Sequence, residues 1–471
     1  MSITSRRQFM GWAAAGFLAP AAVGEDAAEP ISPDATRTLQ QAADAGGVLE
    51  LGPGTYRITE PLVLDTTKCG YVGVRGAQGT ARIVMAGPGP AIRVVGDHQG
   101  TAKPGTVQPH TWERERFPVL SGFEIVGAHP EADGIELFRT MQAVIERVSI
   151  RKCRYGVHLS VRNRNVIITN CHIYDCSDSG IFMDDVSLHQ INILGNHISY
   201  CQHGGIRQFN GDVHNVQITG NDIEYNSGYD GLSCEILLEA PDSGLISEYT
   251  IASNTLQATP DAQGANVAIV GRDNDFTVGE VAISGNVLGS RNKNVYARNA
   301  QRELTITGNT IYTGVAANVH LVQCANVVVG TNTVCTSRGG LKDFGDQGGI
   351  LLEDCAACSL TGNVVRGTTC GDADRGGAVG LVRCRDTAVA SCQILNPGFR
   401  GIYLEDSARC RISDNTIVSQ GDGAPMVAAI SVTGSGSDNV IQNNLVAKGS
   451  KGDIVCGPDG PTLLNNTVVQ S

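Results

Sequence analysis

The stretch ITGNTI, Ile306 to Ile311, is one of a series of similar hexapeptides that recur along the chain. Other copies read ILGNHI, ITGNDI, IASNTL, ISGNVL, VGTNTV, LTGNVV and ISDNTI. The Asn of the hexapeptide falls at Asn196, Asn221, Asn254, Asn286, Asn309, Asn332, Asn363, Asn415, Asn443 and Asn466. Cys171 and Cys392 hold the same position in two further copies, and the steps run from 23 to 33 residues. A period of this length is typical of a solenoid, in which each unit buries its apolar face against its neighbours.

Each repeat contains three short runs of alternating apolar residues and has no room for a helix. In one repeat these runs are LTIT before Asn309, TIYT after it and NVHLVQ around Val319. The chain must therefore coil, so that each strand stacks on its counterpart one turn later at roughly 4.8 Å. The pattern predicts an all-β, single-domain, right-handed parallel β-helix of about 14 coils with three strands per coil. In this arrangement the Ile side chains point inward, Gly-Asn forms the bend, and stacked Asn side chains bond to the turn backbone.

The region before the repeats is predicted to cap the coil. Residues 36–45, TRTLQQAADA, have the pattern of a short amphipathic helix, and residues 29–68 form the N-terminal cap and first coil. The sequence then reads Pro53-Gly54-Thr55-Tyr56. With this motif the chain resembles the pectate-lyase-like right-handed parallel β-helix superfamily. That superfamily includes lyases, hydrolases, epimerases and non-enzymatic adhesins, so the resemblance implies a fold and leaves the activity open.

The first residues resemble a twin-arginine export signal. Ser5-Arg6-Arg7-Gln8-Phe9-Met10 precedes an apolar run from Gly11 to Val23, which is too short to span a bilayer comfortably. We expect residues 1–28 to be a signal peptide and residues 29–471 to be the β-helix domain. With its repeats, the chain resembles the twin-arginine-translocated repeat proteins of bacteria. The resemblance implies that the twin-arginine translocase exports the folded chain to the periplasm or beyond, without stable membrane insertion.

Charge and cysteine content exclude some functions. The net charge is −12 and no basic stripe is present, which argues against a nucleic-acid partner. Most of the 15 cysteines share repeat positions. We therefore interpret them as stacked, buried thiols rather than as disulfides or a metal site. Cys153, Cys176 and Cys201 share one position, and Cys324, Cys355 and Cys384 share another.

The candidate catalytic residues occupy outward positions of the strand that, in each coil, begins at Gly-Ile or a similar pair. One outward row runs Glu136, His158, Phe182 and Arg207, and the row two residues further on runs Phe138, Ser160, Asp184, Phe209 and Glu239. Neighbours in a row lie about 5 Å apart, so these side chains converge. The competing interpretation is an ordinary polar strand end. His320 matches His158, and Glu353-Asp354 and Glu405-Asp406 match Asp184-Asp185.

A long insertion, residues 97–118, emerges at the turn after this strand. Loops of this length in compact domains are usually functional or disordered. It carries Trp112 and Arg114, which suit a sugar ring and a carboxylate respectively. We predict substrate contacts for these two residues and for Phe182 and Phe209.

The resulting hypothesis is an exported carbohydrate-active protein that cleaves an acidic polysaccharide. In β-elimination, Arg207 neutralises a uronate carboxylate and His158 takes the C5 proton. In hydrolysis, two of Glu136, Asp184 and Glu239 act as acid and base. The alternative is a non-catalytic glycan-binding or envelope structural protein, and the sequence leaves the choice open.

Other chemistry has weaker support. His203-Gly204 resembles the His-Gly of β-helix pectin hydrolases, but the aspartate pattern of those enzymes is not evident. No cofactor or metal is predicted. The loops GDQGG and GDADRGG contain Ca²⁺-type oxygen ligands, although solvated glycine-rich turns explain them better.

Overall fold

The computed structural model describes residues 33–100, 103–259, 263–273, 275–335, 348–419, 426–458 and 460–469. The chain divides into two compact units, Met1–Pro33 and Asp34–Ser471, and all described helices and strands belong to the second. The proposed export signal lies outside the described residues. Among the helices that are described, none is long and apolar enough to cross a membrane.

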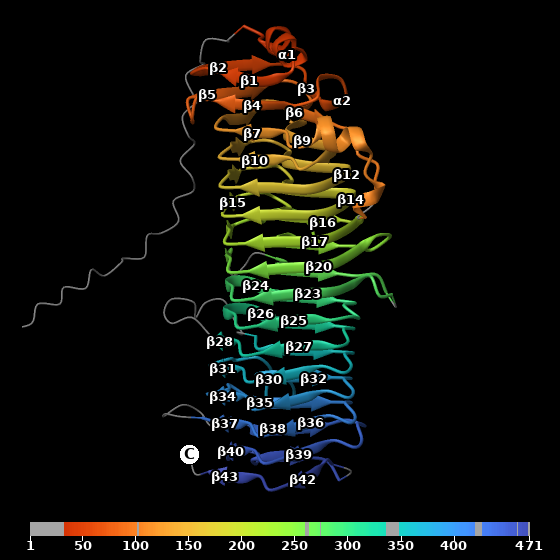
Figure 1. The fold of residues 1–471 in the computed structure, drawn as a ribbon. Helices are drawn as coiled ribbons and strands as arrows, with labels where there is room; N and C mark the ends of the chain where they lie inside the picture. Colours follow the sequence, from red (N-terminus) through yellow and green to blue (C-terminus); the bar gives the residue numbers. More distant parts are fainter. Residues whose placement is uncertain are drawn as a thin grey trace, which may run out of the picture. The chain divides into compact units, whose positions relative to one another are not determined.

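Residues 34–469 form a stack of coils in which every strand pairs in parallel with its counterpart in the next coil (Figure 1). Each complete coil contributes one strand to each of three faces, here called A, B and C in chain order. The predicted parallel β-helix is therefore confirmed. Four coils, which begin at β1, β4, β7 and β10, precede the coil of Cys171, the first that the hexapeptide marks.

Face A lies before the hexapeptide Asn of each coil. It comprises β1 (Gly47–Leu51), β4 (Val72–Gly76), β7 (Val119–Ser121), β10 (Val144–Glu146), the ends of β12 (Tyr155–Thr169) and β14 (Ser179–Leu194), β17 (Asp212–Thr219), β20 (Leu245–Ala252), β23 (Val278–Ser284), β25 (Leu304–Thr307), β27 (Val327–Gly330), β30 (Ser359–Thr361), β33 (Ala388–Ala390), β36 (Arg411–Ser413), β39 (Val440–Gln442) and β42 (Thr462–Leu464).

Face B follows the Asn. It comprises β2 (Gly54–Ile58), β5 (Ala81–Met85), β8 (Glu124–Gly127), β11 (Ser149–Arg151), β13 (His172–Tyr174), β15 (His197–Ser199), β18 (Asp222–Glu224), β21 (Thr255–Gln257), the beginnings of β24 (Val287–Arg298) and β26 (Thr310–Val322), β28 (Thr333–Cys335), β31 (Val364–Arg366), β34 (Gln393–Leu395), β37 (Thr416–Val418), β40 (Leu445–Ala447) and β43 (Thr467–Val469).

Face C carries the candidate catalytic rows. It comprises β3 (Leu62–Asp65), β6 (Gly89–Val95), β9 (Ala132–Met141), the beginnings of β12 and β14, β16 (Gly204–Phe209), β19 (Cys234–Glu239), β22 (Ala265–Val270), the ends of β24 and β26, β29 (Ile350–Glu353), β32 (Val379–Val382), β35 (Arg400–Glu405), β38 (Ala428–Thr433) and β41 (Ile454–Cys456).

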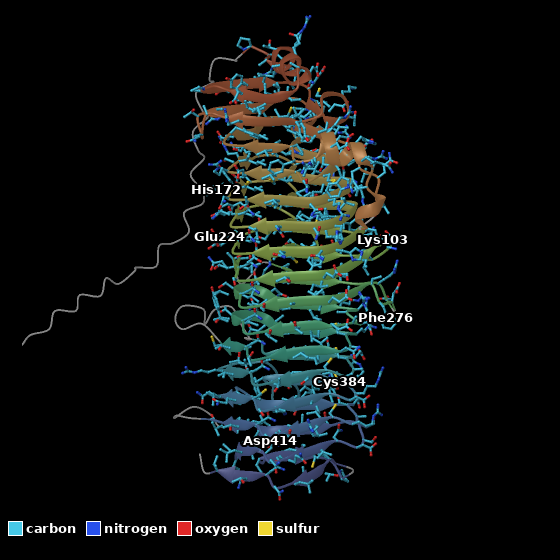
Figure 2. The ribbon with its side chains drawn as sticks, in the orientation of Figure 1. Lys103, His172, Glu224, Phe276, Cys384 and Asp414 are labelled. Atoms are coloured by element: carbon cyan, nitrogen blue, oxygen red, sulfur yellow. The ribbon has the colours of Figure 1, made fainter. Side chains whose placement is uncertain are left out.

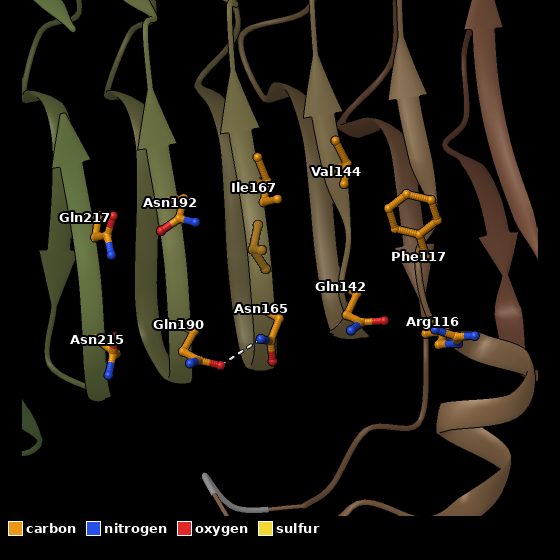
Figure 3. A pocket seen from close by; sticks show the side chains of 11 residues that line it. Arg116, Phe117, Gln142, Val144, Asn165, Ile167, Gln190, Asn192, Asn215 and Gln217 are labelled. Carbon is orange, nitrogen blue, oxygen red and sulfur yellow. Dashed lines mark hydrogen bonds between the residues drawn. The ribbon is translucent and has the colours of Figure 1, made fainter. Parts of the chain in front are cut away.

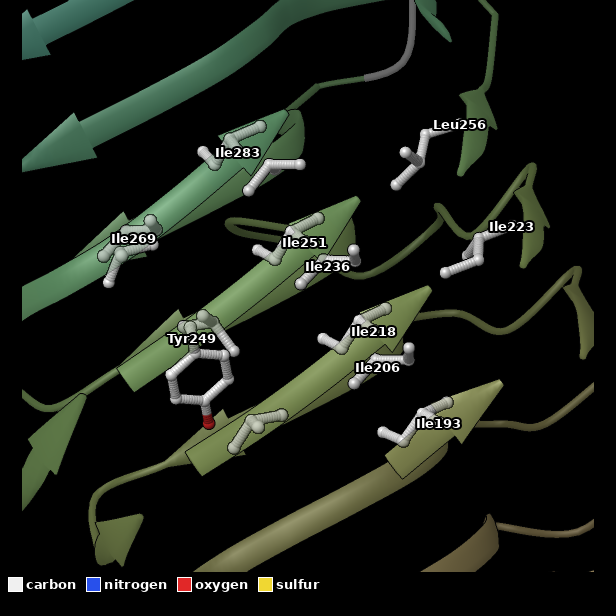
Figure 4. Packing of buried hydrophobic residues seen from close by; sticks show 14 of the residues in the cluster. Ile193, Ile206, Ile218, Ile223, Ile236, Tyr249, Ile251, Leu256, Ile269 and Ile283 are labelled. Atoms are coloured by element: carbon white, nitrogen blue, oxygen red, sulfur yellow. The ribbon is translucent and has the colours of Figure 1, made fainter. Parts of the chain in front are cut away.

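The core is a set of aliphatic columns that run along the stack. Ile193, Ile218, Ile251 and Ile283 occupy one position in consecutive coils, and all four are fully buried (Figure 4). Ile206, Ile236 and Ile269 from face C pack beside them in the same cluster. The inward position predicted for the Ile residues of the hexapeptide is confirmed.

The Asn residues of the hexapeptide form a buried ladder of hydrogen bonds. The backbone N–H and Nδ2 of Asn286 both donate to Oδ1 of Asn309, at 2.9 and 3.0 Å, and Nδ2 of Asn309 donates to the Ile283 carbonyl. One sequence assignment was wrong: the N–H of Asn415 donates to Asn444, so Asn444 occupies the ladder position assigned to Asn443. Asn443 instead takes the preceding bend position with φ 55°, where the other copies have Gly or another turn residue.

None of the 15 cysteines forms a disulfide in the structure, as the repeat positions predicted. Cys153, Cys176 and Cys201 are buried. In the second group, the backbone N–H of Cys324 lies 3.4 Å from Sγ of Cys355.

The predicted capping helix is present as α1 (Thr36–Asp44), and its Leu39 and Ala43 are buried in the common core. Three short helices lie near it: α2 (Thr66–Cys69), η1 (Pro104–Thr106) and the π-helix η2 (Thr111–Glu115). The last two lie in the long insertion.

The loop GDADRGG, residues 371–377, wraps around an arginine. NH1 and NH2 of Arg400 donate to the carbonyls of Asp372 and Ala373 at 2.9 and 2.7 Å. An oxygen-rich turn therefore has a cationic partner within the chain. The other loop, GDQGG, lies mostly outside the described residues.

Candidate active site

The two outward rows predicted from the sequence lie side by side on face C. The first row pairs Glu136, His158, Phe182 and Arg207 in consecutive coils. The second pairs Phe138, Ser160, Asp184, Phe209 and Glu239. Because adjacent strands are roughly 4.8 Å apart, side chains of neighbouring coils touch.

His158 and Asp184 form a hydrogen-bonded pair. Nε2 of His158 lies 3.1 Å from Oδ2 of Asp184. The imidazole stacks on Phe182, with ring centroids 5.7 Å apart, and contacts Tyr155 at 5.2 Å. The side chain of Asp184 remains 43% exposed and that of His158 is 16% exposed. A carboxylate that orients an imidazole beside solvent is an arrangement suited to a general base.

Arg207 lies one coil beyond this pair, between two phenyl rings. Its guanidinium carbon is 4.8 Å from the centre of Phe182 and 5.3 Å from that of Phe209. Nε lies 3.6 Å from Glu239, and NH1 lies 3.7 Å from Asp178. These are ion pairs longer than hydrogen bonds, and the buried Nε has no hydrogen-bond partner among the described residues. Arg207 is thus held between two rings and two carboxylates, with its side chain 13% exposed.

The two carboxyl groups near Arg207 have pKa values shifted in opposite directions. Burial raises the pKa of Glu239, and this effect outweighs the opposing charges of Arg207 and His203. Burial also acts on Asp178, but the nearby His203 and the hydrogen bond from Ser179 outweigh it and lower the pKa of that carboxyl. A raised pKa suits a carboxyl that donates a proton, as Glu239 could, and a lowered pKa suits one that remains ionised, as Asp178 could.

Two members of this cluster were not predicted as site residues. Asp178 and His203 are three residues before the inward Ile181 and Ile206 in consecutive coils, and Nδ1 of His203 lies 3.5 Å from Asp178. The His203 ring also stacks on Tyr229 with centroids 3.8 Å apart. An alignment of the strands that also included the three preceding turn residues would have placed Asp178 and His203 at equivalent positions of consecutive coils.

Glu136 is held differently from the other candidates. Oε2 lies 3.0 Å from Arg93, and Oε1 accepts a hydrogen bond of 2.8 Å from Ser160. Its side chain is 11% exposed. Both carboxylate oxygens therefore have partners, and a catalytic role for Glu136 stays a prediction.

A second His–carboxylate pair on face C repeats the geometry of the first. Nε2 of His320 lies 2.8 Å from Glu353, at the positions that correspond to His158 and Asp184. The next coils place Leu351 and Gly380 beside His320, with no arginine in that row. The His–carboxylate pair therefore recurs as a surface feature, and Arg207 with its two carboxylates distinguishes the candidate site.

The long insertion is anchored at the end of face C nearest the cap. NH2 of Arg114 donates to the Thr67 carbonyl at 3.3 Å, and η2 packs against α2 and β9. Trp112 is half-buried in η2. Arg114 thus contacts the first coil rather than the coils around Arg207, and the substrate contacts of Trp112 and Arg114 stay predictions.

Two groups of side chains in the described ranges have the donor types of a metal site: Asp97, His110 and Glu115, and His197, Asp222 and Glu224. The first group lies within the long insertion, where Nε2 of His110 is 2.6 Å from Oδ2 of Asp97. The second lies on face B, where Figure 2 labels Glu224 and the neighbouring His172. Neither group belongs to the cluster around Arg207.

The family model described as right handed beta helix region matches residues 123–234 and 294–468, and the chain belongs to this family. No curated protein matches the sequence.

The chain is similar to several solved structures at low sequence identity. The catalytic unit of a GH87 alpha-1,3-glucanase from Streptomyces thermodiastaticus is 13% identical with a TM-score of 0.45, over 92% of this chain and 66% of that one. The Dettilon tailspike protein is 15% identical with a TM-score of 0.46, over 79% and 65%. The A-module of the Azotobacter vinelandii mannuronan C-5 epimerase AlgE4 is 15% identical with a TM-score of 0.36, over 93% and 96%. The chain spans slightly less than two thirds of the glucanase and tailspike chains.

Proposed function

We propose that the protein is exported through the twin-arginine pathway and that face C cleaves an acidic polysaccharide. The observation that supports the cleavage site is Arg207, which lies between Phe182 and Phe209 and one coil beyond a His–carboxylate pair. A guanidinium in this setting favours a carboxylate ligand such as that of a uronic acid. The arginine pair followed by an apolar run supports export to the periplasm or beyond.

β-Elimination fits the shifted pKa values and the positions of the side chains. Arg207 binds the uronate carboxylate, which acidifies the neighbouring C5–H. The imidazole of His158, oriented by Asp184, takes the C5 proton, and the electrons of that bond form the C4=C5 double bond. The C4–O bond breaks, and Glu239 supplies the proton to the leaving oxygen. The products are an unsaturated uronate end and a new reducing end.

Hydrolysis uses the same face with different roles. Glu239 would protonate the glycosidic oxygen, and Asp184, two strands away in the same row, would activate a water molecule. This reaction produces reducing ends without a double bond.

The test is to incubate the protein with polygalacturonate, alginate and hyaluronate while following the ultraviolet absorbance of unsaturated uronates and the number of reducing ends. We expect both signals to rise. Arg207→Ala should abolish them, and Arg207→Lys should retain little activity because an ammonium lacks the planar donor pair. His320→Ala is the matched control for His158→Ala, since both remove a histidine paired with a carboxylate on face C.

The remaining outcomes discriminate among the alternatives. Reducing ends without absorbance, lost in Glu239→Gln, would indicate hydrolysis. Equal effects of His158→Ala and His320→Ala would overturn the assignment of the site. Binding of a polysaccharide without either signal would support the non-catalytic alternative.

A further inference from the structure

A hollow of about 530 Å³ lies on face A, next to the end of the long insertion (Figure 3). Its floor consists of outward side chains from four consecutive coils, namely Val144, Ile167, Asn192 and Gln217. Its wall consists of the turn residues that precede these strands, namely Gln142, Asn165, Gln190 and Asn215. Among the described lining residues, six carry amide side chains, none is acidic, and Arg116 is the one cation.

The turn conformation does not by itself account for the amides in the wall. All four wall residues have positive φ angles, between 54° and 65°. Asn tolerates this left-handed conformation, but Gln has no such preference, and two of the four are Gln142 and Gln190. In the next coils the same turn position holds Glu248 and Glu280, also at positive φ. The run of uncharged amides is therefore confined to the coils that follow the insertion.

The insertion places an aromatic ring at the end of this row. Phe117 precedes Gln142 in the series of turn residues, has a φ of 66° and is 58% exposed. Its N–H donates to the Met141 carbonyl at 3.0 Å. The preceding η2 is braced by Tyr71, whose hydroxyl donates to the Glu113 carbonyl at 2.5 Å. The positive φ of Phe117 is common to this series of turn residues, so the distinctive feature is a large apolar ring exposed at the end of the amide row.

The groove continues on the other side of Phe117. A second hollow of about 350 Å³ on face A is lined by Phe117, Val48, Tyr71, Val119 and neighbouring residues. Phe117 thus separates two hollows that follow the axis of the coil stack, crossing the strands at right angles.

We propose that these hollows form a glycan-binding groove for a neutral oligosaccharide chain laid along the stack, with one sugar ring on Phe117. Side-chain amides offer both donors and acceptors, which match hydroxyl groups, and an apolar floor with an aromatic platform matches the C–H face of a sugar. Each coil presents a similar amide at a similar position, so a polymer meets a repeating set of partners. The described residues that line the two hollows include no pair of carboxylates, so the groove is proposed as a binding surface. This inference goes beyond the proposed cleavage site, which lies on face C.

Isothermal titration of the full chain with maltohexaose, cellohexaose and laminarihexaose tests the groove, with hexagalacturonate as the acidic comparison. We expect at least one neutral hexamer to bind. Phe117→Ala should lower the association constant about tenfold, and Gln190→Ala should lower it severalfold. The matched controls are Phe276→Ala, a phenylalanine that is 66% exposed, and Gln323→Ala, a turn glutamine with φ 53° in a remote coil. Both should bind like the wild type.

The proposal is overturned if no neutral hexamer binds, if only hexagalacturonate binds, or if the affinity survives in the Phe117→Ala/Gln190→Ala double variant. Arg207→Ala separates this test from that of the cleavage site. The Arg207→Ala variant should bind the neutral hexamers like the wild type. The Phe117→Ala variant should cleave a short uronate oligomer like the wild type.

Discussion

His98 shows how the long insertion controls the charge of a single side chain. The residue is 1% exposed, and neither ring nitrogen has a hydrogen-bond partner among the described residues. Burial lowers its pKa to about 4, and the charges of Arg162 and Arg164 act in the same direction. The folded protein therefore holds a neutral imidazole at pH values where an unfolded chain, with its ordinary pKa near 6.5, binds a proton.

The first prediction concerns the pH dependence of this region. The stabilising effect of a neutral His98 is fully present above pH 6.5 and is lost as the pH falls towards 4, because only the unfolded state takes up the proton. The unfolding free energy of the wild type relative to His98→Phe should fall by roughly 2 kcal/mol between pH 7.5 and 4.5. Urea unfolding followed by Trp112 fluorescence in a Trp12→Phe background measures it, and a constant difference at both pH values would contradict it.

The second residue-scale prediction concerns a buried ion pair. Arg291 and Glu235 are both fully buried, with NH1 2.5 Å from Oε1, and Arg291 also donates to the Ser233 carbonyl. Burial raises the pKa of Glu235 to about 7 against the opposing charge of Arg291. Arg291→Met should cost about 3 to 5 kcal/mol because it leaves a buried carboxyl without its partner.

Arg298→Met is the control for this experiment. Arg298 pairs with Asp273 at 3.1 Å, but its side chain is 43% exposed. Its loss should cost less than about 1 kcal/mol. Equal losses in chemical denaturation would show that the buried network contributes no more than a surface pair.

At the scale of the repeated element, the Asn ladder satisfies the polar groups of the bend between faces A and B. Each ladder residue accepts from the Asn of the preceding coil and donates to a carbonyl, as Asn332 does with Asn309 and Ile306. Cys171 and Cys392 occupy the same position, and their N–H groups donate to the next Asn. The ladder therefore tolerates a small buried residue that lacks the amide.

This arrangement predicts a graded response to substitution at Asn309. Asn309→Ala leaves the N–H and Nδ2 of Asn286 without their acceptor, at a cost of about 2 to 4 kcal/mol. Asn309→Cys should cost less, because Cys fills more of the space and its thiol is a weak hydrogen-bonding group. Asn326→Ala, at an exposed turn with φ 59°, should cost about 1 to 2 kcal/mol, most of it from placing alanine in a left-handed conformation. An equal loss for all three in thermal unfolding would contradict a specific role of the ladder.

At the scale of the whole molecule, the stacking of the coils buries most of the cysteine side chains. Eleven of the 15 cysteines are buried, Cys69, Cys335 and Cys370 are half-buried, and Cys456 is exposed. Burial raises the pKa of Cys153 and of Cys234 to about 12. The thiolate is the reactive form, so these groups are inert while the coils remain stacked.

Titration with Ellman's reagent tests this arrangement. The native protein should show one rapidly reacting thiol, Cys456, and slow reaction at no more than three others. All 15 should react in denaturant. Cys456→Ser should remove the rapid phase. Rapid reaction of many thiols in the native protein would show that the coils open readily.

The regular strands of this protein could be predicted from the sequence, whereas residues in the turns could not. The rows on face C could be counted from the Gly-Ile starts because side chains in a strand alternate with a period of two, which placed His158, Asp184, Arg207 and Glu239 correctly relative to one another. Asp178 was missed because it lies in a turn, where this period does not apply. Asn443 was misassigned because two consecutive Asn residues fit the same motif.

The sequence by itself determined the coil, the inward columns and the outward rows, because a strict repeat has few ways to bury its apolar residues. Tertiary structure decided which outward residues form sites. The contacts of Arg207 with Asp178 and Glu239, and the position of Phe117 beside the amide row, depend on how turns of unequal length fold against neighbouring coils. These contacts join residues about 25 or more positions apart, and no local pattern specifies them.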